Sequence, residues 1–120
     1  MNDWSFIQQE QKSLCDKLKV IWTPVEIDSL IAINDSLFTS IQPINGLRHP
    51  IEGTIDGWYL WSGDEIPQLD NDFFKPHHVG HLLTIKPIIL KYLGLPPGYR
   101  FQVDNKGYED VWFDSSILEI

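Results

Sequence analysis

Three histidines lie close together in the second half of the chain, at positions 77, 78 and 81. On a helix, His77 and His81 share one face, and their separation of four residues is that of a two-histidine metal clamp. Zinc proteases carry a glutamate directly after the first histidine, whereas this chain has His78 there. Asp70 or Asp72 offers a carboxylate ligand, but nothing in the sequence fixes either beside the histidines. We therefore expect no metal, and a small metal-dependent enzyme is the alternative.

Other residues with catalytic potential lack the partners that catalysis needs. Asp64 and Glu65 are adjacent at a predicted strand end, where neighbouring side chains seldom face one pocket, so an acid–base pair is not expected. Cys15 lies on the apolar face of a predicted helix, which favours an inert buried thiol. The serines have no matched histidine and aspartate, and no glycine-rich phosphate loop is present. These patterns indicate a protein without enzymatic activity and without a cofactor.

Acidic residues dominate the charge of the chain. Its 120 residues include 17 acids and 9 bases, which gives a net charge of −8. Six acids and no bases occur between positions 52 and 72: Glu52, Asp56, Asp64, Glu65, Asp70 and Asp72. A second acidic group comprises Asp104, Glu109, Asp110, Asp114 and Glu119. Such a balance repels phosphate backbones and argues against nucleic-acid binding. The acids either solubilise the surface or steer a basic partner protein onto it.

Length and composition predict one domain that spans residues 1–120. A chain of this length with 42% hydrophobic residues can bury a core of its own. The single cysteine excludes an internal disulfide and fits a reducing compartment. No secretory signal is visible, and no apolar run approaches the roughly 20 residues that span a bilayer. We expect a cytoplasmic protein without membrane contact.

The segment Asp56–Glu65 is predicted to be the central strand around which the chain is organised. Its run Trp58–Trp61 is short, aromatic and uncharged, which suits a buried strand better than a helix. Gly57 and Gly63 bracket the run and can adopt backbone angles that other residues avoid. The two acids at the end of the segment therefore form an acidic lip just past the strand.

Two helices are predicted before this strand. Apolar residues recur at helical spacing over residues 3–19, with polar residues on the opposite face. Thr23 and Pro24 then resemble a helix start, and an apolar stripe continues to about residue 39. Because the connection is short, the two helices are expected to form an antiparallel pair. Residues 40–54 are rich in Pro and Gly and are predicted to be a loop, with at most a short strand near 41–44.

A broken helix and a hairpin are predicted after the central strand. The helix is expected to start at Lys75, to break at Pro87 and to end at Gly94 in a left-handed cap. Strands 99–103 and 108–113 are joined by a tight turn. The expected fold is α+β, with an N-terminal helix pair packed on a small antiparallel sheet of three or more strands and a Pro-broken helix inserted.

Two segments of the chain are similar to a known family. The first is Gly57–Glu65, with its Gly-Trp and Ser-Gly-Asp-Glu elements, and the second is Pro87–Phe101, with a Pro, Tyr-Leu, Gly, Phe pattern. Both resemble a bacterial immunity-protein family that was first catalogued as a domain of unknown function and is linked to polymorphic toxin systems. The resemblance covers about residues 56–101.

The resemblance implies a single immunity-protein-like domain that does no chemistry and neutralises a cognate toxin by binding it. Toxins that attack nucleic acid carry basic clefts, which a carboxylate-rich face can occupy in place of phosphate. Charge and position, and not the family, select the expected contact residues: Asp64, Glu65, Asp70 and Asp72, with Trp61 as an aromatic anchor. A homodimeric regulatory domain that associates through its aromatic sheet is the other alternative, and the oligomeric state stays open.

Overall fold

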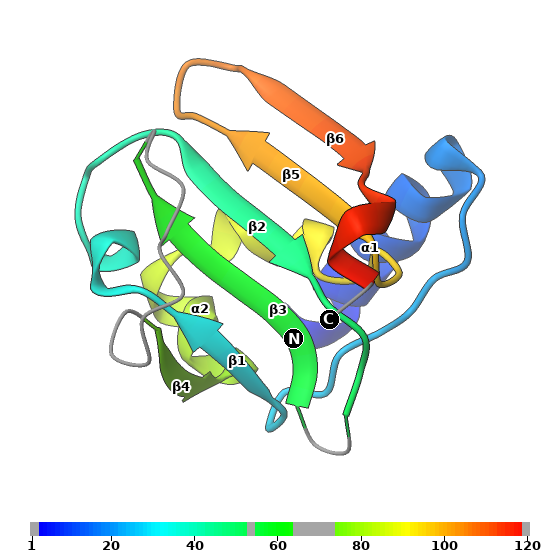
Figure 1. Cartoon of the computed structure of the whole chain (residues 1–120), viewed down its shortest axis with the longest axis horizontal. Coiled ribbons are helices and arrows are strands. Elements are labelled where there is room, and N and C mark those ends of the chain that lie inside the picture. The colour runs from blue at the N-terminus through cyan, green and yellow to red at the C-terminus, as the bar shows by residue number, and fades with distance from the viewer. Residues whose placement is uncertain (1–2, 53–54, 64–73, 119–120) are drawn as a thin grey trace.

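The computed structural model describes residues 3–52, 55–63 and 74–118, which form a single mixed sheet with its longer helices on one face (Figure 1). The six strands lie in the order β4-β1-β3-β2-β5-β6. Their bounds are β1 Leu30–Ile33, β2 Ile44–Arg48, β3 Ile55–Ser62, β4 Lys75–His78, β5 Tyr99–Val103 and β6 Glu109–Phe113. Strand β1 runs parallel to β3 and all other pairs are antiparallel. The fold is α+β, as expected, but its sheet is mixed.

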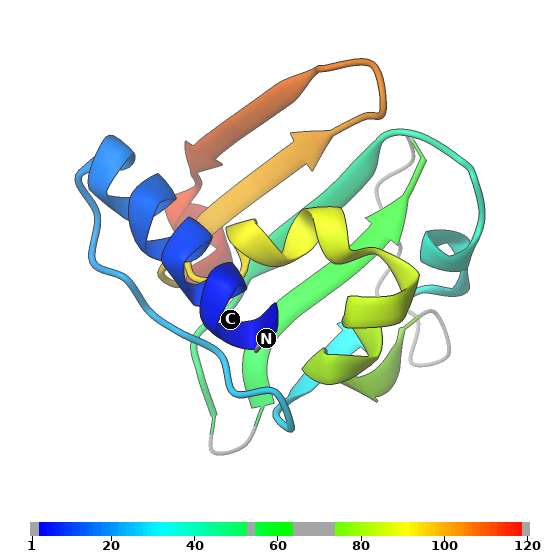
Figure 2. The ribbon, with the colours of Figure 1, turned by 180° about the vertical axis from the view of Figure 1, so that it is seen from behind.

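One long helix, α1 (Asp3–Leu18), packs across the back of the sheet and confirms the first predicted helix (Figure 2). It lies against the 3-10 helix η3 (Pro87–Tyr92). Two side chains of α1 bind backbone carbonyls of the segment they cover: Gln11 Nε2 donates to Leu90 at 2.9 Å, and Cys15 Sγ donates to Gly94 at 3.4 Å. Cys15 is 1% exposed, and its burial raises the pKa of the thiol. None of the described helices is both long and apolar enough to cross a bilayer.

The second predicted helix is wrong, so no helix pair forms. Residues 30–33 are strand β1, and a single 3-10 turn, η1 (Asp35–Phe38), follows it. Ile31 and Ile33 are almost completely buried and alternate with half-buried neighbours, which is the period of a strand. β-Branched side chains pack well on a pleated surface, and the pairing of β1 with β3 overrides the helical spacing of the apolar residues.

Residues 40–54 were predicted as a loop, but they contain the interior strand β2. This strand pairs with β3 on one side and with β5 on the other. A Cβ atom on Gly46 would lie 2.3 Å from the Phe101 ring, so the glycine makes room for an aromatic side chain. A glycine that marks a turn and a glycine that accommodates a neighbour look the same in a sequence.

The predicted helix from Lys75 is also corrected. Its first four residues form the edge strand β4, the helix α2 is limited to Leu82–Ile85, and a 3-10 turn, η2 (Val79–His81), joins them. The break before Pro87 is confirmed, because α2 ends at Ile85. Gly94 does not have the positive φ expected of a left-handed cap. A Cβ there would lie 2.8 Å from atoms of Gln11 and Trp22, so close packing requires the glycine.

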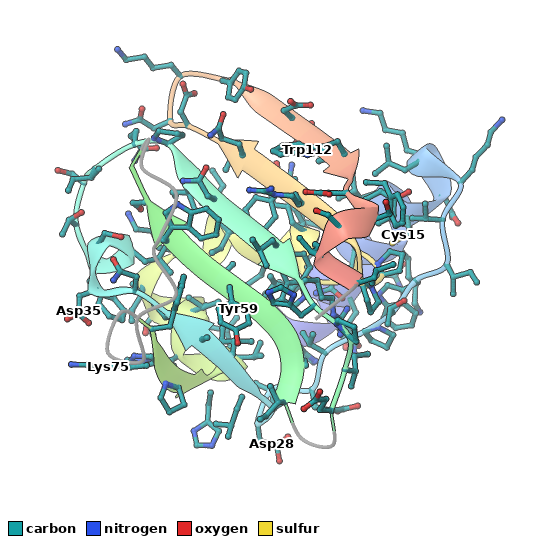
Figure 3. The ribbon with its side chains drawn as sticks, in the orientation of Figure 1. Cys15, Asp28, Asp35, Tyr59, Lys75 and Trp112 are labelled. Atoms are coloured by element: carbon teal, nitrogen blue, oxygen red, sulfur yellow. The ribbon has the colours of Figure 1, made fainter. Side chains whose placement is uncertain are left out.

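The central strand and the C-terminal hairpin are confirmed. Trp58 and Leu60 of β3 and Phe101 of β5 are almost completely buried beneath the helices. The Phe101 ring stacks on Tyr92 of η3, with centroids 4.7 Å apart. On the opposite face of β3, Tyr59 lies on the open side of the sheet (Figure 3). The helices α1, α2 and η3 therefore cover one face. The other face carries polar and aromatic side chains together with the 3-10 turn η4 (Ser115–Leu118), whose Ile117 carbonyl lies 2.9 Å from His49 Nδ1 (Figure 1).

Candidate functional site

The histidines that predicted a metal clamp do not share a helix, because His77 is in β4 and His81 is in η2. Their rings nevertheless stack with centroids 5.3 Å apart, and their Nδ1 atoms are 3.2 Å apart. Phe38 contacts both rings. Burial and the neighbouring His81 lower the pKa of His77, which favours the neutral form of the His77 ring. Among the described residues, no group of three potential ligands gathers here or elsewhere.

Trp61 is the one member of the predicted contact set that the structure describes. It lies near the end of β3, is 3% exposed and packs against Phe74, with ring centroids 6.2 Å apart. Tyr59, on the same face, contacts Phe74 and His49 at 5.0 and 4.9 Å. Asp64, Glu65, Asp70 and Asp72 lie outside the described residues. Gly63, the residue that directly precedes the acidic segment, is held by the sheet.

Gly63 is anchored by a hydrogen-bond chain that crosses three strands. Its N–H donates to the carbonyl of Pro43 at 2.9 Å, and its own carbonyl accepts from Asn45 Nδ2 at 2.8 Å. Asn45 Oδ1 in turn accepts from Gln102 Nε2 of β5 at 2.8 Å. Asn45 is 6% exposed, so these bonds are largely shielded from water. Sequence reasoning missed this role, because Asn45 lies within residues 40–54, which were predicted to be a loop.

The sheet register brings the end of β3 and three acids of the hairpin to one end of the sheet. Ser62 pairs with Ile44, Ile44 with Val103, and Val103 with Glu109, so all four residues lie on one line across the strands. Neighbouring strands are about 4.8 Å apart, so three steps span roughly 14 Å. We call this end of the sheet the acidic rim and define it by Gly63 at the end of β3 and by Asp104, Glu109 and Asp110 of the hairpin. It lies at the top left of Figure 1, where β3 and β5 end.

Two of the rim carboxylates are held by specific donors. Glu109 accepts a hydrogen bond from the Tyr92 hydroxyl and lies 3.6 Å from Lys91 Nζ. The Tyr92 hydrogen bond, followed by the Lys91 charge, lowers the pKa of Glu109, while burial and Glu109 raise the pKa of Tyr92. Asp104 Oδ1 accepts the N–H groups of Lys106 and Tyr108 at 2.8 and 2.9 Å, which fixes the hairpin turn. Hydrogen bonds therefore fix the positions of the Asp104 and Glu109 carboxylates.

A hollow of about 250 Å³ opens at the same end of the sheet. Ile44, Ile88 and Val103 supply apolar lining, and Asp104 adds a carboxylate. Lys86, which also lines the hollow, donates its Nζ to the carbonyl of Thr39 at 3.1 Å. An apolar wall beside a carboxylate suits a long basic side chain, whose stem packs while its charge stays at the edge.

Asp56 is not part of this surface, although it belongs to the acidic run of the sequence. It is 5% exposed, and its carboxylate accepts from Trp58 N at 3.1 Å and from Ser29 Oγ at 3.0 Å. Burial raises its pKa despite these hydrogen bonds. The nearby Arg48 is completely buried, and its burial lowers the pKa of the guanidinium to about 10. Asp56 and Arg48 therefore make their hydrogen bonds inside the protein, at the end of the sheet opposite the rim.

A comparison with protein families decides what kind of protein this is. A family model described as the Imm33-like domain matches residues 10–114, well over half of the chain. The chain belongs to the Imm33-like family. This is an immunity protein family of polymorphic toxin systems, so the resemblance of the two sequence segments to such a family is confirmed. No curated protein and no solved structure matches the chain.

Membership in the Imm33-like family carries three consequences for the chain. The family is non-enzymatic, which agrees with the absence of a catalytic motif from the sequence. An immunity domain implies toxin neutralisation, and it implies a cognate toxin as the partner. The relevant property of the Imm33-like domain is therefore its surface.

Proposed function

We propose that this chain neutralises its cognate toxin by binding it through the acidic rim. The observation that supports this proposal is the strand register, which aligns Glu109 with the end of β3, where the acidic segment begins. The hairpin acids, which come about 40 positions later in the sequence, thereby lie at the end of the sheet from which the acidic segment departs. Their fields add, and a basic surface is drawn to that end. Binding there blocks the toxin, with no chemical step on either side.

The proposed contact set comes from the end of β3 and from the acidic segment that follows it in the sequence. It consists of Asp64, Glu65, Asp70 and Asp72, with Trp61 as the aromatic anchor. Because the indole of Trp61 is 3% exposed, it serves as an anchor only if binding uncovers it. A toxin with a basic cleft for nucleic acid suits this surface, since carboxylates can replace phosphates in its hydrogen bonds. The same charge keeps the chain itself away from nucleic acid.

We assign the encounter to the cytoplasm and treat residues 1–120 as one immunity domain. Cys15 is the only cysteine and is buried as a free thiol, which suits a reducing compartment. The described strands form a single sheet with one core, in keeping with a single domain.

Neutralising the four acids of the contact set tests the proposal. The variant D64N/E65Q/D70N/D72N is expected to bind the cognate toxin about 10- to 100-fold more weakly, because several exposed charge pairs are lost together. Isothermal titration with the cognate toxin measures the change. The loss is expected to shrink at high ionic strength, since exposed charges are screened by salt.

A matched variant separates local contacts from overall charge. The control is D16N/E26Q/D28N/E52Q, which removes four acids elsewhere. Asp28 precedes β1, which runs parallel to β3, and so lies at the end of the sheet opposite the rim (Figure 3). This control should retain affinity within about threefold. Equal weakening by both variants would contradict binding through the rim.

A further inference from the structure

The described part of the sheet has two edge strands, β4 and β6, and only β4 contains a proline. Strand β4 has four residues and contains Pro76, which lacks an N–H group. Strand β6 has five residues and no proline. Natural proteins usually blunt an exposed edge with proline, a bulge or a cover, because its unpaired backbone groups attract other strands. The β6 edge has no proline, and its residues Glu109, Asp110, Trp112 and Phe113 are exposed.

The hydrogen bonds at both ends of the hairpin show which backbone groups of β6 point outward. Asp104 N donates to Tyr108 O at 3.1 Å, and Asp114 N donates to Gly98 O at 2.7 Å. Hydrogen-bonded and non-hydrogen-bonded pairs alternate along an antiparallel ladder. Residues 108, 110, 112 and 114 therefore direct their N–H and C=O groups toward β5. The groups of residues 109, 111 and 113 point away, and no hydrogen bond of the described residues satisfies them.

The side chains of β6 favour a partner over solvent. Trp112 is 36% exposed and Phe113 is 51% exposed, and both are large apolar residues on a surface strand. Trp112, labelled in Figure 3, lies under the guanidinium of Arg100, with 5.4 Å between Arg100 Cζ and the ring centroid. Aromatic residues beside unpaired backbone groups are typical of edges that receive an added strand.

We propose that an extended, basic segment of the cognate toxin pairs with β6 as a seventh strand. This inference rests on the proposed function and specifies how the partner docks. The charge of the edge selects the occupant, because Glu109 and Asp110 begin the strand and Asp104 precedes it at the rim. Backbone hydrogen bonds supply affinity, and the carboxylates select lysine or arginine side chains.

A second copy of the chain fits the edge less well. Each copy carries a net charge of −8, so two copies repel each other. In a two-fold pairing centred on Val111, Glu109 would lie opposite the Phe113 position of the other copy and would gain no cation. The basic toxin segment therefore has the better charge complementarity.

Proline substitution at the outward-facing position 111 tests the docking edge. Val111→Pro removes an N–H that points away from β5, so the ladder within the hairpin keeps its hydrogen bonds while the ring obstructs an added strand. We expect the dissociation constant for the toxin to rise at least about tenfold. His78→Pro is the matched control: Val79 N donates to Ser29 O, so by the same alternation the amide of His78 points outward from β4. Its affinity should stay within about twofold of the wild type.

Amide exchange in the wild-type chain gives a test that does not depend on how a variant folds. On addition of toxin, the amides of Glu109, Val111 and Phe113 should become protected at least about tenfold, while that of His78 should not. Bound toxin without protection of these amides would overturn the proposal, as would wild-type affinity of a folded Val111→Pro variant.

The outcomes also separate this inference from the proposed function. If the four-acid variant weakens binding and Val111→Pro does not, the rim binds the toxin but β6 does not pair with it. If the wild-type chain does not bind the toxin, both proposals fail. A free chain that sediments as a dimer, and becomes a monomer on Val111→Pro, would assign the edge to a second copy and overturn the choice of occupant.

Discussion

Replacement of Arg48 by methionine is expected to lower the free energy of unfolding by about 3–5 kcal/mol, as measured by urea denaturation. The guanidinium is completely buried, and it donates from Nε to Asp56 O at 2.8 Å and from Nη1 to Thr23 O and Leu95 O at 2.7 and 2.8 Å. Because these acceptors are backbone carbonyls, a substitution that removes the guanidinium leaves all three of them in place. Methionine fills much of the volume but leaves the three carbonyls unpaired.

Arg100→Met is the matched control for this prediction. Arg100 is the partner of Asp114 at 3.1 Å, and its side chain is 23% exposed. Because solvent can replace part of this interaction, the expected loss is only about 1 kcal/mol. Domains of this kind are stable by about 5–15 kcal/mol, so Arg48→Met should be marginal and Arg100→Met should be well folded. Equal losses in the two variants would refute the role assigned to Arg48.

Gly57→Ala is expected to cost at least about 3 kcal/mol, because the added methyl group has no space. Gly57 has φ +92°, and its Cβ would lie 2.1 Å from the carbonyl oxygen of His49. The same two residues are joined by a hydrogen bond from His49 N to Gly57 O at 2.8 Å. The contact therefore cannot relax without separating β2 from β3 at this end of the sheet.

Gly107→Ala isolates the steric part of this cost. Gly107 has φ +96°, close to the value at Gly57, but a Cβ there would meet nothing within 4 Å. Its substitution should cost only the 1–2 kcal/mol or so of a positive φ. The difference between the two variants in thermal or urea denaturation measures the clash with His49. If Gly107→Ala were as destabilising as Gly57→Ala, backbone conformation alone would explain both.

Local patterns predicted the elements whose signals are strong within a few residues. Helix α1 has 16 residues with apolar positions at helical spacing, and the hairpin of β5 and β6 has alternating side chains around a Gly107 turn. The aromatic run of β3 was confirmed for the same reason. The residues within each of these elements are enough to identify it, so contacts with distant parts of the chain are not needed to predict its position.

The strands that were missed depend on neighbours distant in the sequence. Strand β1 has four residues, too few to show alternation against the helical spacing of the apolar residues around it. In β2, Gly46 is required by Phe101, which comes 55 positions later in the sequence. In β4, Pro76 favoured a helix start, but an edge strand tolerates proline equally well. Tertiary pairing decided each case.

The candidate site was predictable in its charge but not in its geometry. The acids at positions 104, 109 and 110 were recognised as a group separate from the central segment. Only the register of β3, β2, β5 and β6 shows that this group reaches the end of the sheet at which Gly63 lies. The Asn45 hydrogen bonds that anchor Gly63 likewise depend on pairing between strands.

The activity of the cognate toxin, titrated with the purified chain, tests the central claim most directly. We expect activity to fall to background near one equivalent of the chain at low ionic strength, and inhibition to weaken as salt screens the exposed carboxylates. The four-acid variant should require a substantially larger excess. A toxin that stays fully active in the presence of saturating chain, or an inhibition indifferent to both salt and these substitutions, would contradict neutralisation through the acidic rim.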